Sequence, residues 1–342
     1  MNKAVAQKKN RQITVVDVAE EAGVSVSAVS RAFNPNGSCS DKMKAKVFSA
    51  AEKLDYKPNR LARGLKSRSS LIGILVTDFE NPAYLQILND FTRTIQARNC
   101  HSLLINVSED MNIAEAIDLV MEYHVDGLIV TSSALPKELV EACQSKGTPV
   151  VIFGRHSRES SATMVYCDNV AGGRMAADLL LDAGYLRPAF IGGLVGASTT
   201  TDRQRGFISR LIERGCEYWQ TAEGGRHSYD AGFDATCKLF NSADQPDSLF
   251  FVDDIMACGG IDAIRYEFAL RVPEDVGVIG VDDIRFARSK AYNLSTVRQP
   301  FSEMVTASVE ALFRHLDNPE QAPQQIIVPC QMVKRGSTLL KG

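Results

Sequence analysis

The sequence predicts an α/β fold, with a small N-terminal head of three helices followed by a larger body of two parallel, doubly wound sheets. Three observations support this prediction. Residues 1–70 carry 14 lysines and arginines against 6 acidic residues, a net charge of +8, whereas the remainder carries −11. The basic segment shows short helical patterns separated by turns. The remainder alternates strand-like and helical runs over roughly 270 residues, which indicates parallel sheets and is long enough for two of them.

The composition is that of a globular protein. The 342 residues are 45% hydrophobic and 23% charged, with 24 glycines, 12 prolines and 8 cysteines, which excludes collagen-like, disordered and disulfide-scaffold chains. No run approaches the ~18 apolar residues that span a membrane, and the first residues lack the apolar segment of a secretory signal. The scattered cysteines form no C-x-x-C pair, which favours buried reduced thiols over zinc or redox motifs. We therefore expect a cytoplasmic protein without membrane contact, metal site or cofactor.

The first two predicted helices form a helix-turn-helix. Thr14 and Asp17 are spaced as in a capping box, and Gly23 supplies the left-handed position that ends the first helix. Ser25 caps a second helix directly after the turn, and a third helix is expected from Ser40. The apolar positions of the three helices are enough to close a small core.

In a helix-turn-helix, the second helix enters the major groove of DNA with its N-terminal end first. Arg31 is placed to donate two hydrogen bonds to a guanine, and Val26 to contact a thymine methyl group. The alternatives for Arg31 are a phosphate contact or a surface salt bridge. The predicted DNA-facing residues of this helix are Val26, Ser27, Ser30 and Arg31.

A short basic segment, residues 58–70, follows Pro58. Leu61, Ala62 and Leu65 form an apolar strip among arginines and lysines, in a helix too short to be stable alone. Such a wedge suits folding on DNA and opening a minor-groove step, and a flexible charged linker is an equal alternative. The DNA contacts predicted from this segment are those of Arg60, Ala62, Leu65 and Lys66.

The runs DVAEEAGVSVSAVSRAFN and YKPNRLARGLK resemble the head and hinge of the LacI/GalR family of bacterial transcription factors. The resemblance extends from about Ile13 to the C-terminus. It implies a dimeric, nucleoid-associated regulator, expected to be a repressor, that binds a pseudo-palindromic operator and responds to a small-molecule effector. It places Val26, Ser27 and Arg31 on base-contacting positions and Leu65 on the inserting leucine of the hinge. Gly64 and Cys39 depart from the family pattern: Gly64 makes hinge folding less favourable, and we interpret Cys39 as a packing residue.

The body contains seven strand-like runs with helical runs between them. The strand-like runs are 71–76, 102–107, 127–131, 150–153, 189–191, 249–252 and 276–281, and the helical runs include 84–98, 114–123 and 170–183. The resemblance implies a type-1 periplasmic-binding-protein fold, in which two lobes close on a ligand, and we expect the chain to cross between the lobes near 168–169 and 297–301. The predicted divisions are a basic arm at 1–12, the helix-turn-helix domain at 13–57, the hinge at 58–70 and the body at 71–342, with one lobe at about 71–168 and 300–320 and the other at about 169–299 and 321–342.

Polar residues that closely follow predicted strands indicate a ligand site, because ligands of open α/β sheets bind outside the carboxyl ends of the strands. These residues are Asp78, Asn81, Arg155, Asp253, Asp254, Asp282 and Asp283. The alternative for Asp253 and Asp282 is capping of the helix that follows the strand.

The resemblance implies effector contacts at several of these positions and at others. Arg203 in DRQRGF and Asp282 in GVDD match ligand positions of the family. Asp253 stands where an Asn is usual, and His227 stands where an aromatic ring often stacks on the ligand, with an exposed loop histidine as the equal alternative. The candidate effector-binding residues are Asp78, Asn81, Tyr84, Arg155, Arg203, His227, Asp253, Asp282 and Gln299. This ionic set favours a sugar or polyol, and an acidic or phosphorylated sugar would also use the two arginines.

These features predict a DNA-binding regulator controlled by a metabolite. We expect a homodimer on double-stranded DNA, because one short recognition helix gives little specificity alone. The sequence shows no catalytic constellation, since it lacks H-E-x-x-H and G-x-S-x-G, and the glycine-rich run at 192–196 lacks dinucleotide-binding spacing. The rivals are a pure solute-binding protein, which the basic head argues against, and an α/β sugar-metabolising enzyme with an appended DNA-binding head.

Overall fold

The computed structural model describes residues 13–33, 37–57, 69–76, 79–107, 113–131, 137–157 and 160–338. The chain divides into two compact units, Met1–Ser69 and Ser70–Gly342. The first unit contains the predicted head, and the second is the predicted body. Among the helices described, none is both long and apolar enough to cross a bilayer.

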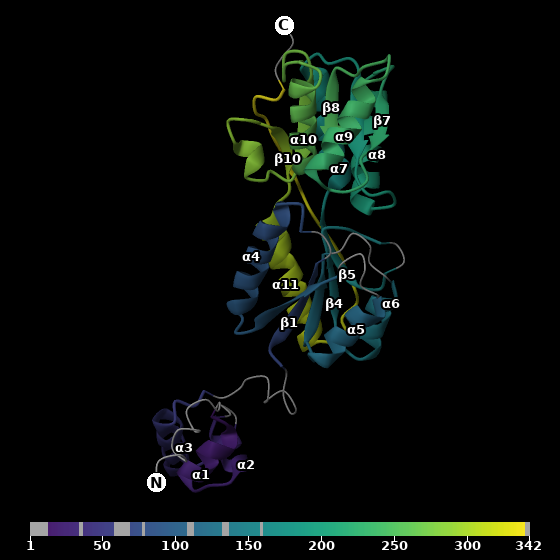
Figure 1. Cartoon of the computed structure of the whole chain (residues 1–342). Helices are drawn as coiled ribbons and strands as arrows, with labels where there is room; N and C mark the ends of the chain where they lie inside the picture. The colour runs from purple at the N-terminus through teal and green to yellow at the C-terminus, as the bar shows by residue number, and fades with distance from the viewer. Residues whose placement is uncertain are drawn as a thin grey trace, which may run out of the picture. The chain divides into compact units, whose positions relative to one another are not determined.

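The head has the predicted helix-turn-helix and a third helix. Its helices are α1 (Val15–Ala22), α2 (Val26–Phe33) and α3 (Asp41–Lys53) (Figure 1). Thr14 and Asp17 form the predicted capping box. Gly23 ends α1 with a φ of 58°, a left-handed conformation that glycine adopts without steric strain. The Ser25 hydroxyl accepts a hydrogen bond from the Ala28 amide at 3.2 Å, so α2 begins as the sequence predicts.

The three helices of the head pack around a small apolar core. Its buried members are Val18, Ala19, Ala22, Val29, Ala32, Val47, Ala50 and Ala51. The aromatic ring of Phe33 packs edge-on against Phe48 and Tyr56 at the margin of this core. Cys39 is one of the half-buried residues packed against it, as predicted.

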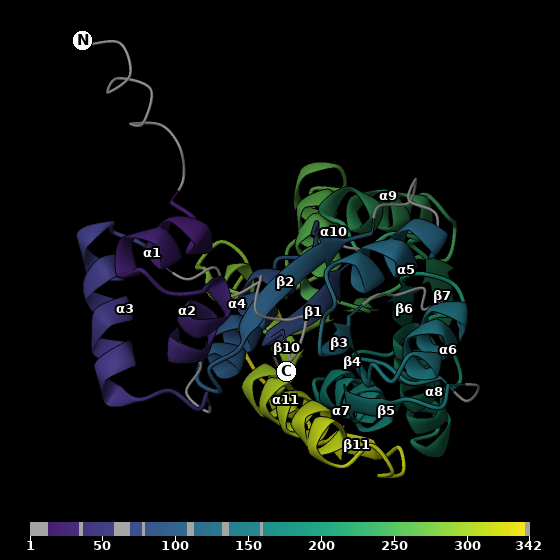
Figure 2. The same ribbon diagram turned by 90° about the horizontal axis from the view of Figure 1, so that it is seen from below.

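The first lobe of the body is built on a six-stranded sheet with the strand order β11-β5-β4-β3-β1-β2, parallel throughout. Its strands are β1 (Leu71–Val76), β2 (His101–Asn106), β3 (Gly127–Val130), β4 (Val150–Phe153), β5 (Thr163–Cys167) and β11 (Gln325–Val328). Helices α4 (Ala83–Gln96) and α11 (Phe301–Asp317) cover one face of the sheet, and α5 (Ile113–Glu122) and α6 (Lys137–Ser145) cover the other (Figure 2). Because both faces are covered, β1, β3 and β4 are nearly continuous apolar runs.

The second lobe is built on another six-stranded sheet, with the order β12-β10-β9-β8-β6-β7. Its strands are β6 (Pro188–Gly192), β7 (Gln220–Glu223), β8 (Ser248–Phe251), β9 (Gly277–Val281), β10 (Ser295–Arg298) and β12 (Gln331–Val333), of which β12 alone runs antiparallel to its neighbour. Helices α7 (Asn169–Asp182) and α8 (Ser198–Glu213) pack together on one face, and α9 (Tyr229–Phe240) and α10 (Asp254–Tyr266) on the other. A 3-10 turn, η3 (Phe286–Arg288), follows β9. The predicted fold class is confirmed.

Within residues 160–338 the chain crosses between the two lobes three times. The crossings lie at Asp168, at 299–300 and at 329–330. The first two fall where the sequence predicts them. The predicted lobe boundary at residue 320 is wrong, because β11 pairs with β5 in the first lobe and only β12 belongs to the second. Both strands are short and lie at sheet edges, so their local pattern carries no signal of the sheet that each one joins.

Candidate functional site

The outer face of α2 presents the residues that the sequence predicts to contact DNA. Val26, with 42% of its surface exposed, lies in the first turn. Ser27, Ser30 and Arg31 are exposed on the same helix, while Ala28, Val29 and Ala32 on its opposite face are buried. The apolar face therefore anchors α2 in the head and leaves the predicted reading face open to solvent. Arg60, Ala62, Leu65 and Lys66, and Asp78 of the body, lie outside the described residues, so their roles stay predictions.

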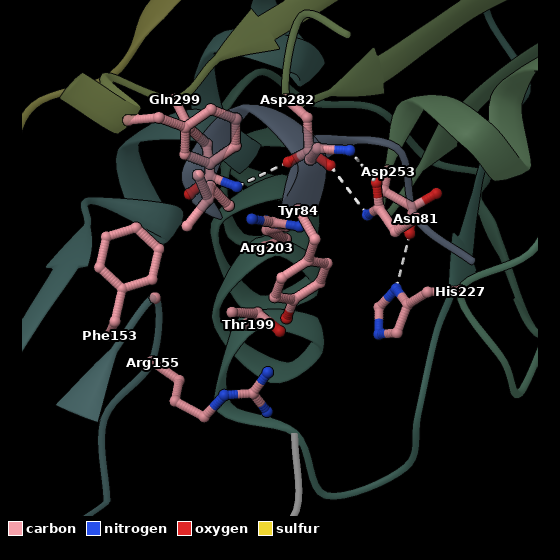
Figure 3. Close-up of a pocket in the computed structure, with 14 residues that line it drawn as sticks. Asn81, Tyr84, Phe153, Arg155, Thr199, Arg203, His227, Asp253, Asp282 and Gln299 are labelled. Atoms are coloured by element: carbon pink, nitrogen blue, oxygen red, sulfur yellow. Dashed lines mark hydrogen bonds and ion pairs between the residues drawn. The ribbon is translucent and has the colours of Figure 1, made fainter. Parts of the chain in front are cut away.

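A cavity between the two lobes of the body brings together the other predicted effector-binding residues (Figure 3). They come from both lobes and from the second crossing, and they are far apart in the sequence. The cavity is lined by Asn81, Ala83, Tyr84, Ile87, Phe153, Gly154, Arg155, Thr199, Arg203, His227, Asp253, Asp282, Gln299 and Phe301. Every predicted effector-binding residue that the structure describes is in this lining, which follows from its position at the carboxyl ends of the strands.

Asp282 connects the two lobes through its carboxylate. Its Oδ2 accepts a hydrogen bond from Asn81 Nδ2 of the first lobe at 3.2 Å, and its Oδ1 accepts one from Gln299 Nε2 at 2.6 Å. Its φ of 116° is uncommon for a residue with a side chain. The turn is held by the Asp282 amide, which donates to the Val297 carbonyl at 2.9 Å. A strained residue kept in place by its neighbours is typical of a ligand site.

Burial and charge set the protonation of Asp282. Burial of the carboxyl group and the nearby charge of Asp253 raise the pKa of Asp282 to about 6, although Arg203 and the two amide donors oppose this rise. The Asp282 side chain therefore changes between its neutral and ionised forms near pH 6. The neighbouring Asp283 differs, because the guanidinium groups of Arg335, Arg298 and Arg288 outweigh its burial and hold its pKa below the usual value.

Arg203 is a buried cation at the wall of the cavity, with 4% of its surface exposed. Its Nε donates to Asn169 Oδ1 at 2.8 Å and its Nη1 donates to the Val252 carbonyl at 2.5 Å. The bond to Asn169 depends on close contact between α7, which begins at Asn169, and α8, which carries Arg203. A Cβ atom on Gly173 would collide with the Arg203 carbonyl, and one on Gly206 would collide with the Val170 carbonyl. The two glycines therefore let the helix backbones touch and fix the direction of the guanidinium group.

His227 and Asp253 form a pair on the second-lobe side of the cavity, with 2.6 Å between His227 Nδ1 and Asp253 Oδ2. The second oxygen of Asp253 accepts from the Met256 amide at 2.9 Å and caps α10. Asp253 therefore has both of the roles that the sequence left open, as a helix cap and as a cavity residue. His227 is not an exposed loop residue, since only 13% of its side chain is accessible.

Asp253 and Asp282 are each followed directly by another aspartate, and this second aspartate has a structural role. The Asp254 carboxylate accepts hydrogen bonds from Thr296 Oγ1 at 2.6 Å and from the Ile284 amide at 2.9 Å. Burial raises the pKa of Asp254 well above its usual range. Asp283 binds three arginines, with 2.7 Å between its Oδ2 and Arg298 Nε. These bonds hold the loops that carry Asp253 and Asp282.

Apolar rings complete the cavity, and the sequence did not identify most of them. Tyr84 was predicted, and its hydroxyl donates to the Thr131 carbonyl at 3.0 Å. Phe153 ends β4 and Phe301 begins α11, and both line the cavity together with Thr199 of α8. In the view of Figure 3, the Tyr84 ring lies between Arg155 and Asp282. The position of Phe153 at the carboxyl end of a strand was the available signal for its role.

A helix-turn-helix head together with a two-lobed body that encloses a polar cavity defines a class of DNA-binding regulators with a small-molecule domain. Residues 14–59 match the model of the bacterial regulatory proteins of the lacI family, and residues 177–338 match a periplasmic binding protein-like domain. The HTH-type transcriptional repressor PurR of Edwardsiella ictaluri is 30% identical over 95% of this chain and 96% of its own length. The ribose operon repressor of Escherichia coli is also 30% identical, over 95% of this chain and 99% of its own.

Among solved structures, a lac repressor dimer bound to operator and the anti-inducer ONPF superposes with a TM-score of 0.84. It is 26% identical, over 96% of this chain and all of the other. The chain belongs to the LacI family of bacterial transcriptional regulators and is a DNA-binding transcriptional repressor with an effector-binding domain. The matched relatives are regulators rather than enzymes, in agreement with the expectation from the sequence.

Proposed function

We propose that this repressor binds a pseudo-palindromic operator as a homodimer, and that a sugar, sugar acid or sugar phosphate in the interlobe cavity controls its operator affinity. The observation that carries this proposal is the convergence of Asn81, Arg155, Arg203, Asp282 and Gln299, which are distant in the sequence, on one cavity. A cavity shared by two lobes gives a ligand different contacts in the closed and open states, which is the physical requirement for control.

The chemistry of the cavity supports a polyhydroxylated ligand. The carboxylates of Asp253 and Asp282 accept hydrogen bonds from hydroxyl groups, and the guanidinium groups of Arg155 and Arg203 donate them. Tyr84 and the other rings of the lining offer apolar surface to a sugar ring. Two arginines in one cavity also fit a carboxylate or phosphate on the ligand.

The proposed operator contacts come from α2. Arg31 donates two hydrogen bonds to guanine O6 and N7, Val26 contacts a thymine methyl group, and Ser27 bonds a base edge or a phosphate. The exposure of these side chains on one face supports this assignment. A second copy is part of the proposal because two heads reading two half-sites multiply the specificity of one short helix.

A thermal-shift screen of the full-length chain against sugars, sugar acids and sugar phosphates tests the effector class. Because a ligand that binds only the folded state stabilises it, we expect one class to raise the melting temperature by about 5 °C at roughly 100 times its Kd. Arg203→Ala should remove the shift. Arg174→Ala is the matched control, since its exposed ion pair with Glu213 on the surface of α7 and α8 is outside the cavity.

The screen also separates neutral sugars from acidic and phosphorylated ones. A shift with neutral sugars alone favours hydroxyl recognition, and a shift only with acids or phosphates assigns the arginines to an anion. A response that survives in Arg203→Ala would contradict the assignment of the cavity.

A further inference from the structure

Two cysteines lie beside or within two of the segments that cross between the lobes. Cys167 is the last residue of β5, directly before the first crossing at Asp168. Cys330 lies in the third crossing, between β11 of the first lobe and β12 of the second. The two positions are 163 residues apart in the sequence, and the pairing of β11 with β5 brings the two segments together, with Val328 opposite Cys167.

The side chains of these cysteines meet in the interior. Cys330 Sγ lies 3.3 Å from the Asp168 carbonyl, to which it donates, so the third crossing touches the first. Both thiols line a small void together with Gly172, Val297 and Arg203. Cys167 is 1% exposed and Cys330 is 6% exposed. Each thiol is the largest influence on the pKa of the other: the neighbouring Cys330 raises the pKa of Cys167, and the neighbouring Cys167 lowers that of Cys330.

We propose that Cys167 and Cys330 form a reversible disulfide that ties the first crossing of the body to the third. All eight cysteines are free thiols in the structure, so this is the reduced form of the pair. Disulfides in cytosolic proteins are usually transient and responsive to oxidants, which fits a pair of this kind better than a permanent crosslink.

The reaction requires a peroxide as two-electron oxidant. The Cys330 thiolate attacks hydrogen peroxide, which forms a sulfenic acid and releases hydroxide, and that hydroxide takes up the thiol proton to give water. The Cys167 sulfur then attacks the sulfenic sulfur, the S–S bond forms, and the departing hydroxyl group takes the Cys167 proton as a second water. In total, two thiols lose two electrons and two protons, and one peroxide becomes two waters. A dithiol reverses the change by thiol–disulfide exchange.

A disulfide at this position would restrain closure of the two lobes. Lobe closure requires the crossing segments to shift relative to one another, and a bond between two of them restrains this shift. Arg203 lines both the void beside the thiols and the effector cavity, so the two sites share a wall. The restraint on effector response rests on the proposed function, whereas formation of the bond does not.

Peptide mapping of the full-length chain tests the proposal without an effector or DNA. The purified protein is treated with hydrogen peroxide, its remaining thiols are alkylated with N-ethylmaleimide after denaturation, and the digest is analysed by mass spectrometry. We expect a Cys167–Cys330 crosslinked peptide that disappears after treatment with dithiothreitol. Full alkylation of both cysteines, or their linkage to other cysteines instead, would overturn the proposal.

Variants and a second measurement sharpen this test. Cys167→Ser and Cys330→Ser should each lose the crosslink, and Cys143→Ser, which removes another buried thiol, should keep it. If either serine variant does not fold, the peptide map of the unaltered chain still shows whether the Cys167–Cys330 disulfide forms. Amide hydrogens at 167–172 and 329–333 should exchange more slowly in the oxidised chain, and unchanged exchange would contradict the restraint on the crossings.

Discussion

At the scale of single residues, the protonation of Asp282 is expected to govern the affinity of the cavity. The carboxylate is ionised above a pKa of about 6 and protonated below it. A neutral hydroxyl ligand gains its bonds from the ionised form, so its affinity should be about tenfold weaker at pH 5 than at pH 8. Titration calorimetry with the sugar retained from the thermal-shift screen measures this. Asp282→Asn should flatten the profile, and an equally steep profile in that variant would refute the role of Asp282.

The raised pKa of Asp282 also makes the stability of the unliganded protein depend on pH in a definite direction. Its folded-state pKa is raised above the ordinary value, so its contribution to the free energy of unfolding is fully present below about 4 and is lost as the pH rises through about 6. Asp283 has the opposite sign, because its pKa is lowered and its contribution is lost on acidification. Without a ligand, the buried Asp282 carboxylate therefore lowers the free energy of unfolding near neutral pH. Such a local loss of stability is consistent with a binding site.

Arg31 on the exposed face of α2 is expected to carry base discrimination. Arg31→Ala should cost about 1–3 kcal/mol of preference for the operator over random DNA, because the bidentate contact with guanine is lost. Competition binding at one fixed salt concentration measures this preference. Lys53→Ala on α3, which removes an equal charge from the head, is the control and should leave the preference unchanged. An unaltered preference in Arg31→Ala would show that this side chain does not read a base.

Most of the polar residues of the cavity and the ring of Tyr84 could be predicted from the sequence, and its other rings could not. Asn81, Asp253 and Asp282 closely follow strands. Burial of a polar group at such a position costs free energy, so its presence there indicates a role. Phe153, at the end of an apolar strand, and Phe301, at the start of a helix, look like core residues in the sequence, because the same local pattern occurs in a cavity wall and in a core.

At the scale of helices and strands, the contact between α7 and α8 is expected to support the site. Gly206→Ala would place a Cβ atom against the Val170 carbonyl and force the helices apart. We expect a loss of about 1–3 kcal/mol in the free energy of unfolding and weaker effector binding, because Arg203 moves with the helix. Urea denaturation measures the first effect. Gln204→Ala on the same helix is the control, and equal stability of the two variants would contradict the packing argument.

The prediction of elements from the sequence succeeded where burial produces a continuous pattern. β1 and β4 have the predicted bounds because both faces of each strand are covered, which requires an unbroken apolar run. The sequence missed five strands: β5 and β10, which lie inside their sheets, and β7, β11 and β12, which lie at sheet edges. Residues of β7 alternate between half-buried and exposed, and such short edge strands resemble loops in composition.

At the scale of the whole body, a contact outside the cavity is expected to favour closure of the lobes. His156 Nε2 of the first lobe lies 2.6 Å from Asp202 Oδ2 of α8, and the His156 amide donates to Ser198 Oγ at 3.1 Å. Asp202→Asn should weaken effector binding several-fold, since the contact between the lobes loses its charged acceptor while the cavity keeps its lining. Glu213→Gln on the same helix is the control. Unchanged affinity in Asp202→Asn would exclude this contact from closure.

The order of the lobes along the chain shows the limit of local patterns. Two of the three crossings lie where the sequence predicts them, and each directly precedes a long helix, α7 or α11. The third depends on which edge β11 and β12 each join, and pairing with β5 and β10 is a long-range event that residues 325–333 do not encode by themselves.

The most direct test of the account measures operator affinity with the effector cavity empty and filled. Fragments selected from genomic DNA by the purified chain are titrated by fluorescence anisotropy, with and without a saturating concentration of the sugar that stabilises the protein. The account predicts that this sugar changes the operator Kd by about 5- to 150-fold, and that Arg203→Ala binds the operator normally but shows no change. An operator Kd that is the same with and without the bound sugar would contradict the account.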